Sequence, residues 1–565
     1  MSTQVTTDFD AIVVGSGITG GWAAKELTEK GLKVLLLERG RHVEHGRDYK
    51  TEFKAPWELP WRGEGDQQLF KRDYPIQSRV HHLNEWTYQH FVNDREHPYQ
   101  TVEGKPFTWI RGYQLGGRSL IWGRQTYRWG DVDFRSNSRD GHGVDWPVRY
   151  EDIAPWYDHV EEFIGVSGAP ENLPQLPDGK FMPPMALNPV EAALREQLDR
   201  TYPERRLTIG RTTNITQPLP GRSPCQYRSI CARGCSFGAY FSTQSSTLPA
   251  ASATGNLTLK TNTLVDKLLY DADRKRITGV NVIDTETGAR KSYSSKVVFL
   301  CAGSVNSVAL MLRSTSGTFP KGLANSSGVL GRYFMDHASS LAVLAQIPGF
   351  DEHYYEGVRP TGIVIPRFRN LGETPDNVEF SRGYSYQGGA YRLTWNRGRR
   401  MAGLGTEFKN ELQKPGPWMF ALTAFAESIP RASNRILQSN KTDSFGVPQV
   451  LFDFEHGDNE RKALQEAAAE ARKMVELIGG RVLMSSGEPN EGGMAIHEMG
   501  GARMGRDRAD SVLNSNNQAH DIPNLFVTDG AAMASSACQN PSLTYMAFTA
   551  RAANYAAELV KNGQL

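Results

Sequence analysis

The stretch Asp10-Ala-Ile-Val-Val-Gly15-Ser-Gly17-Ile-Thr-Gly20-Gly21, near the N-terminus, decides the fold. The apolar run before its first glycine predicts a buried strand, and Ala23 to Leu27 predicts a helix after the G-x-G-x-x-G turn. A second apolar run, Val34 to Leu37, ends at Glu38 and predicts a neighbouring parallel strand. Strand, tight turn, helix and strand in this order are typical of a dinucleotide-binding unit.

Each glycine of the turn has its own task. Gly15 permits the turn, Gly17 lets the backbone approach a pyrophosphate, and Gly20 lets helix and sheet pack closely. The phosphates then lie against unpaired N–H groups at the helix start, where the helix dipole favours negative charge. Glu38 is placed to accept both hydroxyls of an adenosine ribose. We therefore expect a bound dinucleotide rather than a plain glycine turn.

Length and charge restrict the class of protein. A chain of 565 residues exceeds one compact core, so two domains are expected. The net charge of +2, without a dense basic run, argues against nucleic acid and anionic membrane surfaces as partners. No apolar run approaches the ~18 to 20 residues that a membrane span needs. Met1 to Asp8 lacks the basic and apolar regions of an export signal, so none is expected.

Strands suited to one parallel sheet are predicted near both ends of the chain and in its middle, at Ala11–Val14, Lys296–Leu300 and Asn524–Thr528. Between the last two, a strand-rich segment runs from about Asp336 to Phe454. We therefore predict an α/β fold in which a discontinuous Rossmann-type domain carries an inserted α+β domain built on an antiparallel sheet.

The predicted division assigns residues 1–335 to the cofactor domain, residues 336–480 to a substrate domain, and residues 481–565 to the return of the cofactor domain. The first part includes an aromatic surface excursion, 54–99, and a cysteine-bearing segment, 221–240. The excursion is interpreted as a lid or subunit contact, with an ordered loop packed for stability as the equal alternative.

Five further motifs follow the first glycine turn in a fixed order. They are the turn Gly116-Gly117, Gly331-Arg-Tyr-Phe-Met-Asp336-His337, His497-Glu-Met-Gly500-Gly501-Ala-Arg503-Met504-Gly505, Phe526-Val-Thr-Asp529-Gly530 and Asn540-Pro541-Ser-Leu-Thr544. Together they resemble the glucose–methanol–choline (GMC) family of flavin oxidoreductases over nearly the whole chain. The resemblance is strongest to the sugar-oxidising branch of pyranose oxidases and bacterial glucoside 3-dehydrogenases.

The resemblance implies that the dinucleotide is FAD, held in a domain like that of p-hydroxybenzoate hydroxylase. The second glycine turn lacks the histidine through which pyranose oxidases often attach FAD, so noncovalent FAD is expected. The expected cofactor-binding residues are Gly15, Gly17, Gly20, Glu38, Arg39, Gly116, Gly117, Ser119, Val265, Asp529, Gly530 and Thr544.

Oxidation of a secondary alcohol needs a hydride acceptor, which is the flavin, and a base for the hydroxyl proton. Histidine suits the base because its ordinary pKa of about 6.5 lets it accept a proton near neutrality. The family places its catalytic pair at His497 and Asn540, the amide holding the substrate oxygen. Otherwise the histidine caps a turn and the asparagine starts a helix. His337 and His520 are interpreted as surface or structural residues.

Three of the five cysteines, Cys225, Cys231 and Cys235, form a C-x5-C-x3-C pattern. Thiolates at this spacing can converge on an iron–sulfur cluster, whereas structural zinc normally needs a fourth ligand. Another metal, a disulfide or free thiols are the alternatives. The family resemblance implies a three-iron four-sulfur cluster on these cysteines. Cys301 and Cys538 are interpreted as small packing residues.

The sequence thus predicts an FAD-dependent dehydrogenase that oxidises a glucoside or pyranose, with C3 as the expected position, and passes electrons through the cluster to a cytochrome c or another acceptor. A small export subunit and a periplasmic location are expected from the resemblance, with the cytoplasm as the alternative. Other functions left open are a GMC dehydrogenase for another sugar, sugar acid or polyol, an oxygen-using glycoside 3-oxidase, and a flavin-binding electron-transfer or assembly subunit. An NAD(P)H-dependent reductase is disfavoured because one dinucleotide fingerprint is found.

Overall fold

The first glycine turn joins the elements that the sequence predicts. The computed structural model describes residues 5–352 and 359–565. In it, strand β1 (Val5–Val14) runs into the turn, helix α1 (Ile18–Glu29) follows, and β2 (Val34–Leu37) returns parallel to β1. The β1 strand pairs in parallel on its other side with β10 (Arg290–Leu300).

These strands belong to a seven-stranded sheet in the order β7-β2-β1-β10-β9-β8, with β18 paired to β10. The other strands of this sheet are β7 (Leu257–Lys260), β8 (Thr263–Asp271), β9 (Arg276–Asp284) and β18 (Leu525–Val527). The strands β8 and β9 form an antiparallel hairpin, and β18 is parallel to β10. Segments from both ends and the middle of the chain thus share one sheet, which confirms the α/β fold.

A second sheet has six antiparallel strands in the order β17-β11-β14-β13-β12-β6. Its strands are β6 (Thr208–Ile209), β11 (Ala338–Ile347), β12 (Ile363–Ile365), β13 (Tyr384–Arg392), β14 (Trp418–Ala426) and β17 (Arg481–Met484). Helix α10 (Asp458–Glu476) packs on β11 and β14. Because β6 and β17 lie outside residues 336–480, the proposed domain limits stay a prediction.

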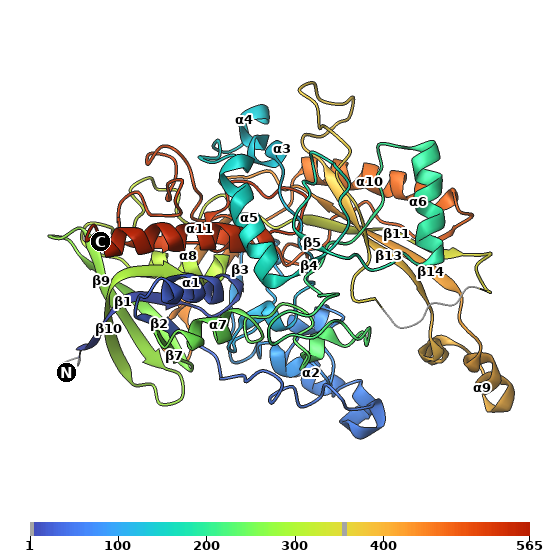
Figure 1. Ribbon diagram of the computed structural model, residues 1–565, viewed down its shortest axis with the longest axis horizontal. Coiled ribbons are helices and arrows are strands. Elements are labelled where there is room, and N and C mark those ends of the chain that lie inside the picture. The colour runs from blue at the N-terminus through green and yellow to red at the C-terminus, as the bar shows by residue number, and fades with distance from the viewer. Residues whose placement is uncertain (1–4, 353–358) are drawn as a thin grey trace.

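Figure 1 shows the two sheets side by side, with α1 and α11 on the seven-stranded sheet and α6 and α10 on the six-stranded antiparallel sheet. The remaining helices are α2 (Gln67–Asp73), α3 (Asp131–Phe134), α4 (Ser136–Asp140), α5 (Tyr150–Ile164), α6 (Pro189–Thr201), α7 (Thr247–Ala253), α8 (Ser304–Arg313), α9 (Gly405–Gln413) and α11 (Ser542–Lys561). The remaining strands are β3 (Gln100–Thr101), β4 (Val166–Ser167), β5 (Phe181–Met182), β15 (Arg435–Thr442) and β16 (Pro448–Asp453).

The excursion 54–99 folds into α2 and several short 3-10 turns around a small core of its own. That core contains Phe70, Leu83, Phe91 and Ile110. No helix in the part of the chain that the structure describes has both the length and the apolar character to cross a bilayer.

Candidate active site

A cavity of about 780 Å³ opens where three helices begin. Its lining includes Gly17 at the start of α1, Gly303 before α8 and Pro541 before α11. Each helix start presents unpaired N–H groups and the positive end of a dipole, which suits a pyrophosphate and other electron-rich groups. The antiparallel sheet contributes Gln387 from β13 and Phe425 from β14.

The cofactor residues expected from sequence divide into two groups. Lining the cavity are Gly15, Gly17, Glu38, Arg39, Gly117, Ser119, Val265, Asp529 and Gly530. Gly20, Gly116 and Thr544 lie outside the lining. A Cβ on Gly20 would lie 1.8 Å from the Gly15 carbonyl oxygen, so that glycine serves helix–strand packing. The Thr544 hydroxyl is 2.8 Å from the Tyr157 hydroxyl and helps pack α11 against α5.

Glu38 is held by Ser16 of the first glycine turn and by the backbone of Gly40. Its carboxylate accepts from the Ser16 hydroxyl at 2.6 Å and from the Gly40 N–H at 2.9 Å. The same Ser16 oxygen accepts from the Gly116 N–H at 2.9 Å. Ser16, which the sequence analysis did not single out, therefore ties the first glycine turn to the second.

Replacing Gly17 by valine is expected to weaken FAD binding by about 10- to 100-fold without unfolding the chain. A Cβ on Gly17 meets no protein atom within 4 Å, and its backbone φ of −65° suits any residue, so the side chain extends into the cavity. Flavin content and a thermal melt of the apoprotein measure the two effects separately. Gly20→Ala is the contrasting variant, because its Cβ collides with protein backbone and lowers the melting temperature itself. Equal flavin content in wild type and Gly17→Val would contradict the placement.

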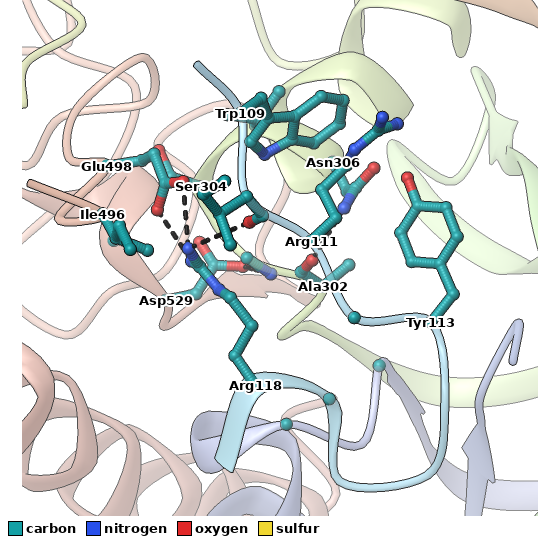
Figure 2. A pocket seen from close by; sticks show the side chains of 18 of the residues that line it. Trp109, Arg111, Tyr113, Arg118, Ala302, Ser304, Asn306, Ile496, Glu498 and Asp529 are labelled. Carbon is teal, nitrogen blue, oxygen red and sulfur yellow. Dashed lines mark hydrogen bonds and ion pairs between the residues drawn. The ribbon is translucent and has the colours of Figure 1, made fainter. Parts of the chain in front are cut away.

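An ion pair and a buried carboxylate occupy another wall of the cavity (Figure 2). Arg118 makes a two-pronged contact with Glu498, at 2.7 and 3.0 Å. Asp529 accepts from the Gly303 N–H at 3.0 Å and from the Ser307 hydroxyl at 2.5 Å, and burial raises its pKa to about 6. Asp529 thereby joins the end of β18 to the start of α8 beside the cavity.

The predicted pair, His497 and Asn540, meets in the same cavity. The Asn540 Nδ2 lies 3.0 Å from the His497 Nε2, and the Asn540 Oδ1 accepts from the Gln387 Nε2 at 2.6 Å. The other ring nitrogen of His497 lies 2.8 Å from the Nδ1 of His337. Burial, with the positive charge of Arg118 nearby, holds the pKa of His497 well below its usual 6.5, so the ring is a neutral base at neutral pH.

The loop that carries His497 is fixed by one carboxylate. The Asp336 Oδ1 accepts from the His497 N–H at 2.8 Å, and its Oδ2 accepts from Gly493 at 2.8 Å and Ala495 at 3.3 Å. Burial and the neighbouring Glu498 raise the pKa of Asp336 to about 7. The sequence motif that ends in Asp336-His337 therefore supports the catalytic loop from the start of β11.

A second buried carboxylate lies behind Asn540. The Asp133 Oδ2 accepts from the Gly130 N–H at 2.7 Å and from the Gln539 side chain at 3.2 Å, whereas its Oδ1 has no partner among the described residues. Burial, and then the charge of Glu427, raise the pKa of Asp133 to about 7 from 3.8. The folded chain therefore holds this carboxyl protonated over a pH range where the unfolded chain ionises it.

Asp133→Asn is expected to stabilise the protein at pH 8 and to change it little at pH 5. Unfolding releases the Asp133 proton between about pH 4 and 7, so the wild type loses roughly 4 kcal/mol of stability over that range, most of it above pH 5, and the neutral variant does not. Melting temperatures of both proteins at the two pH values measure the difference. Asp273→Asn, at an exposed aspartate, is the control. A melting-temperature gain of the same size at pH 5 and pH 8 would be inconsistent with the raised pKa.

The three clustered cysteines line one small cavity of their own, which we call the cysteine cavity. The Cys225 sulfur accepts from the Tyr227 N–H at 3.5 Å, the Cys231 sulfur from the Asn214 amide at 3.8 Å, and the Cys235 sulfur from Arg228 at 3.9 Å. Within residues 5–352 and 359–565, no set of three or more His, Cys, Asp or Glu side chains has the geometry of a site for a metal ion.

The cysteine cavity lies close to the larger one. Its 3-10 turn η6 (Cys231–Arg233) packs against η5 (Gly117–Leu120), which belongs to the second glycine turn. Ala239 lines the cysteine cavity. Two residues further along the chain, the Phe241 carbonyl accepts a hydrogen bond from the indole N–H of Trp122, and Trp122 lines the larger cavity. One short segment therefore connects the two cavities.

Comparison with known proteins identifies the family. The GMC oxidoreductase N-terminal family model matches residues 9–339, and the C-terminal one matches residues 430–549. The chain belongs to the GMC oxidoreductase family. It is therefore an FAD-dependent oxidoreductase that acts on CH–OH groups, and the cavity with the His497–Asn540 pair is its candidate active site.

Relatives with similar sequences cover almost the whole chain. It is 27% identical to the 2-methyl-1,2-propanediol dehydrogenase of Mycolicibacterium austroafricanum over 97% of this chain and 94% of that protein. It is 25% identical to the fructose dehydrogenase large subunit of Gluconobacter japonicus over 99% of each. Among solved structures, pyridoxine 4-oxidase from Mesorbium loti has a TM-score of 0.62 at 16% identity, covering 97% of this chain and 98% of that one, which shows a shared fold.

Proposed function

We propose that this GMC oxidoreductase is a dehydrogenase that converts a secondary hydroxyl of a glucoside or other pyranoside, at C3, to a ketone. The observation that carries the proposal is the hydrogen-bonded pair of His497 and Asn540 in a cavity whose glycine turns and helix starts suit FAD. When bound, FAD supplies the acceptor for the hydride that leaves the substrate carbon.

The chain's own side chains handle the proton and the oxygen. The His497 Nε2 takes the proton of the substrate hydroxyl, and the Asn540 amide donates to the oxygen as negative charge develops on it. Gln387 holds the amide in this orientation, because its Nε2 donates to the Asn540 Oδ1. A neutral amide does not titrate near pH 7, so its donation is constant over the working range.

Residues around the pair suit a sugar. Trp122 and Phe425 offer apolar ring surfaces, and Gln125 and Gln387 offer side-chain amides in the same cavity. A few polar groups among aromatic side chains are typical of small-molecule sites, and a pyranose has both an apolar face and a ring of hydroxyls. Selectivity for C3 and for glucosides rests on the sequence resemblance to glucoside 3-dehydrogenases.

We further propose that Cys225, Cys231 and Cys235 hold a three-iron four-sulfur cluster. The three cysteines line one cavity and each sulfur accepts a hydrogen bond, as the thiolates that hold iron–sulfur clusters do. When bound, the cluster supplies one-electron transfer between the flavin and an outside acceptor, for which we propose a cytochrome c. The packing of η6 on η5, which belongs to the second glycine turn, supports this role.

Exposed aromatic side chains offer contacts for the partner subunits that this proposal includes. Trp57 and Trp61, 80% and 64% exposed on the excursion 54–99, and Tyr227, exposed beside Cys225, offer apolar contacts to other subunits. One relative is named a large subunit, which supports a multi-subunit assembly. We propose a small subunit that carries the export signal and a periplasmic location.

The decisive experiment is anaerobic spectroscopy of the purified protein with a panel of glucosides and free sugars, followed by product analysis to locate the new ketone. Bleaching of the flavin with a 3-keto product is expected. Iron analysis and an electron paramagnetic resonance spectrum of the oxidised protein test the cluster. Protein purified without oxygen that holds no iron would refute the relay, and absence of bleaching by any sugar would refute the substrate class.

A dehydrogenase for a small diol or polyol is the second candidate, favoured by the relative named 2-methyl-1,2-propanediol dehydrogenase. The same panel with diols separates the two, because the faster bleaching identifies the substrate class. Hydrogen peroxide formed in air would instead indicate an oxidase.

A further inference from the structure

We propose that His337 is a positioning residue that holds His497 in the one tautomer able to accept the substrate proton. The kinetic test of this inference rests on the proposed function, because it needs a substrate that reduces the flavin. It starts from three contacts of His337, which is 1% exposed at the start of β11. Its Nδ1 lies 2.8 Å from the Nδ1 of His497, and its Nε2 lies 3.0 Å from the carbonyl oxygens of Ser536 and Ala537.

The two carbonyls decide where the His337 proton lies. A carbonyl oxygen only accepts, so the His337 Nε2 must carry hydrogen. Burial lowers the pKa of His337 to about 4, so the ring is neutral and its Nδ1 has a free electron pair. In the contact between the two rings, His497 Nδ1 is therefore the donor and His337 Nδ1 the acceptor.

Whether the His497 Nε2, on the opposite side of the ring, donates or accepts is determined in the same way. Gln387 donates to the Asn540 Oδ1, which turns the Asn540 Nδ2 toward the His497 Nε2. The Nε2 atom consequently accepts, and its electron pair points at the Asn540 amide within the cavity. Two chains of hydrogen bonds, one from Gln387 and one ending on the Ser536 and Ala537 carbonyls, thus agree on a single tautomer. With the proton on Nε2 instead, His497 has no electron pair to offer the substrate hydroxyl.

The charged groups near His337 and His497 do not determine the tautomer of His497 by themselves. Asp336 contacts the backbone of His497, and its neighbour Glu498 is paired with Arg118. His456 lies near His337 and is held neutral by burial, with a pKa of about 4. Among the described residues, His337 is the hydrogen-bond partner of the His497 Nδ1.

Two variants of His337 separate the tautomer role from packing. Asparagine places an oxygen near the position of Nδ1 and keeps an acceptor for His497. Glutamine places its amide near the position of Nε2 and keeps the donor for the carbonyls, but leaves a methylene beside His497. We expect His337→Gln to lower the rate constant of flavin reduction about 100-fold and to change the pH profile of kcat/KM, whereas His337→Asn stays within about 10-fold.

Nitrogen NMR of protein labelled with ¹⁵N-histidine gives a readout independent of any substrate. The signal of His497 is assigned by its loss in His497→Asn. We expect the Nδ1–H form in wild type and in His337→Asn, and a mixture or the Nε2–H form in His337→Gln. An Nε2–H form in wild type would overturn the proposal, and so would an unchanged tautomer together with an unchanged pH profile in His337→Gln. If no alcohol reduces the flavin, the NMR result still decides the tautomer.

Discussion

His497→Ala is expected to lower the rate constant of flavin reduction by substrate about 10³-fold while FAD stays bound. General base catalysis contributes 10²- to 10⁴-fold, and no other neutral imidazole in the described chain lies within hydrogen-bond distance of Asn540. FAD is retained because the glycine turns, Glu38 and the start of α1 are unchanged. Stopped-flow spectroscopy without oxygen measures the reduction, and the absorbance of the purified protein measures the flavin.

Two further variants make this result specific. His142→Ala, at an exposed histidine away from the cavity, controls for loss of a ring and is expected to behave as wild type. Asn540→Ala removes the donor to the substrate oxygen but leaves the base, so a loss of about 10²-fold is expected. Reduction of His497→Ala within 10-fold of the wild-type rate would assign the base elsewhere.

Cys231→Ser is expected to reduce electron transfer to cytochrome c more than 100-fold while flavin reduction by substrate stays within about twofold. Serine replaces a soft thiolate by a hard hydroxyl, which iron–sulfur clusters bind poorly. Cys231 lines the cysteine cavity and does not line the larger cavity that suits FAD. Its replacement therefore affects the transfer of electrons out of the flavin and not the reduction of the flavin by substrate. Iron content, stopped-flow reduction and cytochrome assays are measured on the same preparation.

Cys538→Ala is the matched control for loss of a thiol, since Cys538 does not line the cysteine cavity and its replacement should leave iron content and cytochrome reduction by the reduced flavin unchanged. Cytochrome reduction by Cys231→Ser at the wild-type rate, with iron absent, would show that electrons leave the flavin by another route.

The fold was predictable from sequence because its signals are local. The glycine turn from Gly15 to Gly20, with apolar runs on both sides, predicts β1, α1 and β2 within a few residues. The apolar run before Gly303 likewise predicts a strand and then a helix, found as β10 and α8. The strand-rich composition predicts the antiparallel character of the second sheet. It does not predict the pairing of β6 and β17, because strands more than 130 residues from their partners leave no local pattern.

The site was predictable where a motif carries it and hidden where side chains meet from distant segments. Motifs predict His497 and Asn540. For His337 the sequence leaves a surface and a structural place open, and its burial against His497 excludes the surface one. The pair of Arg118 and Glu498 joins residues 380 positions apart. Cys301, interpreted as a packing residue, also lines the flavin cavity. A signal for His337 existed in its place next to Asp336, within a motif shared with the family.

The antiparallel sheet lies mostly between the two family-model matches, at residues 340–429, and β13 and β14 reach the cavity through Gln387 and Phe425. The glycine turns of the cofactor site are anchored elsewhere, on the seven-stranded sheet, whereas the proton-accepting pair also depends on Gln387 of β13 and on His337 next to β11. Enzyme engineers can therefore vary the other cavity-facing positions of these two strands, with Gln387 kept, to redirect the enzyme to new alcohols without rebuilding its electron-handling half.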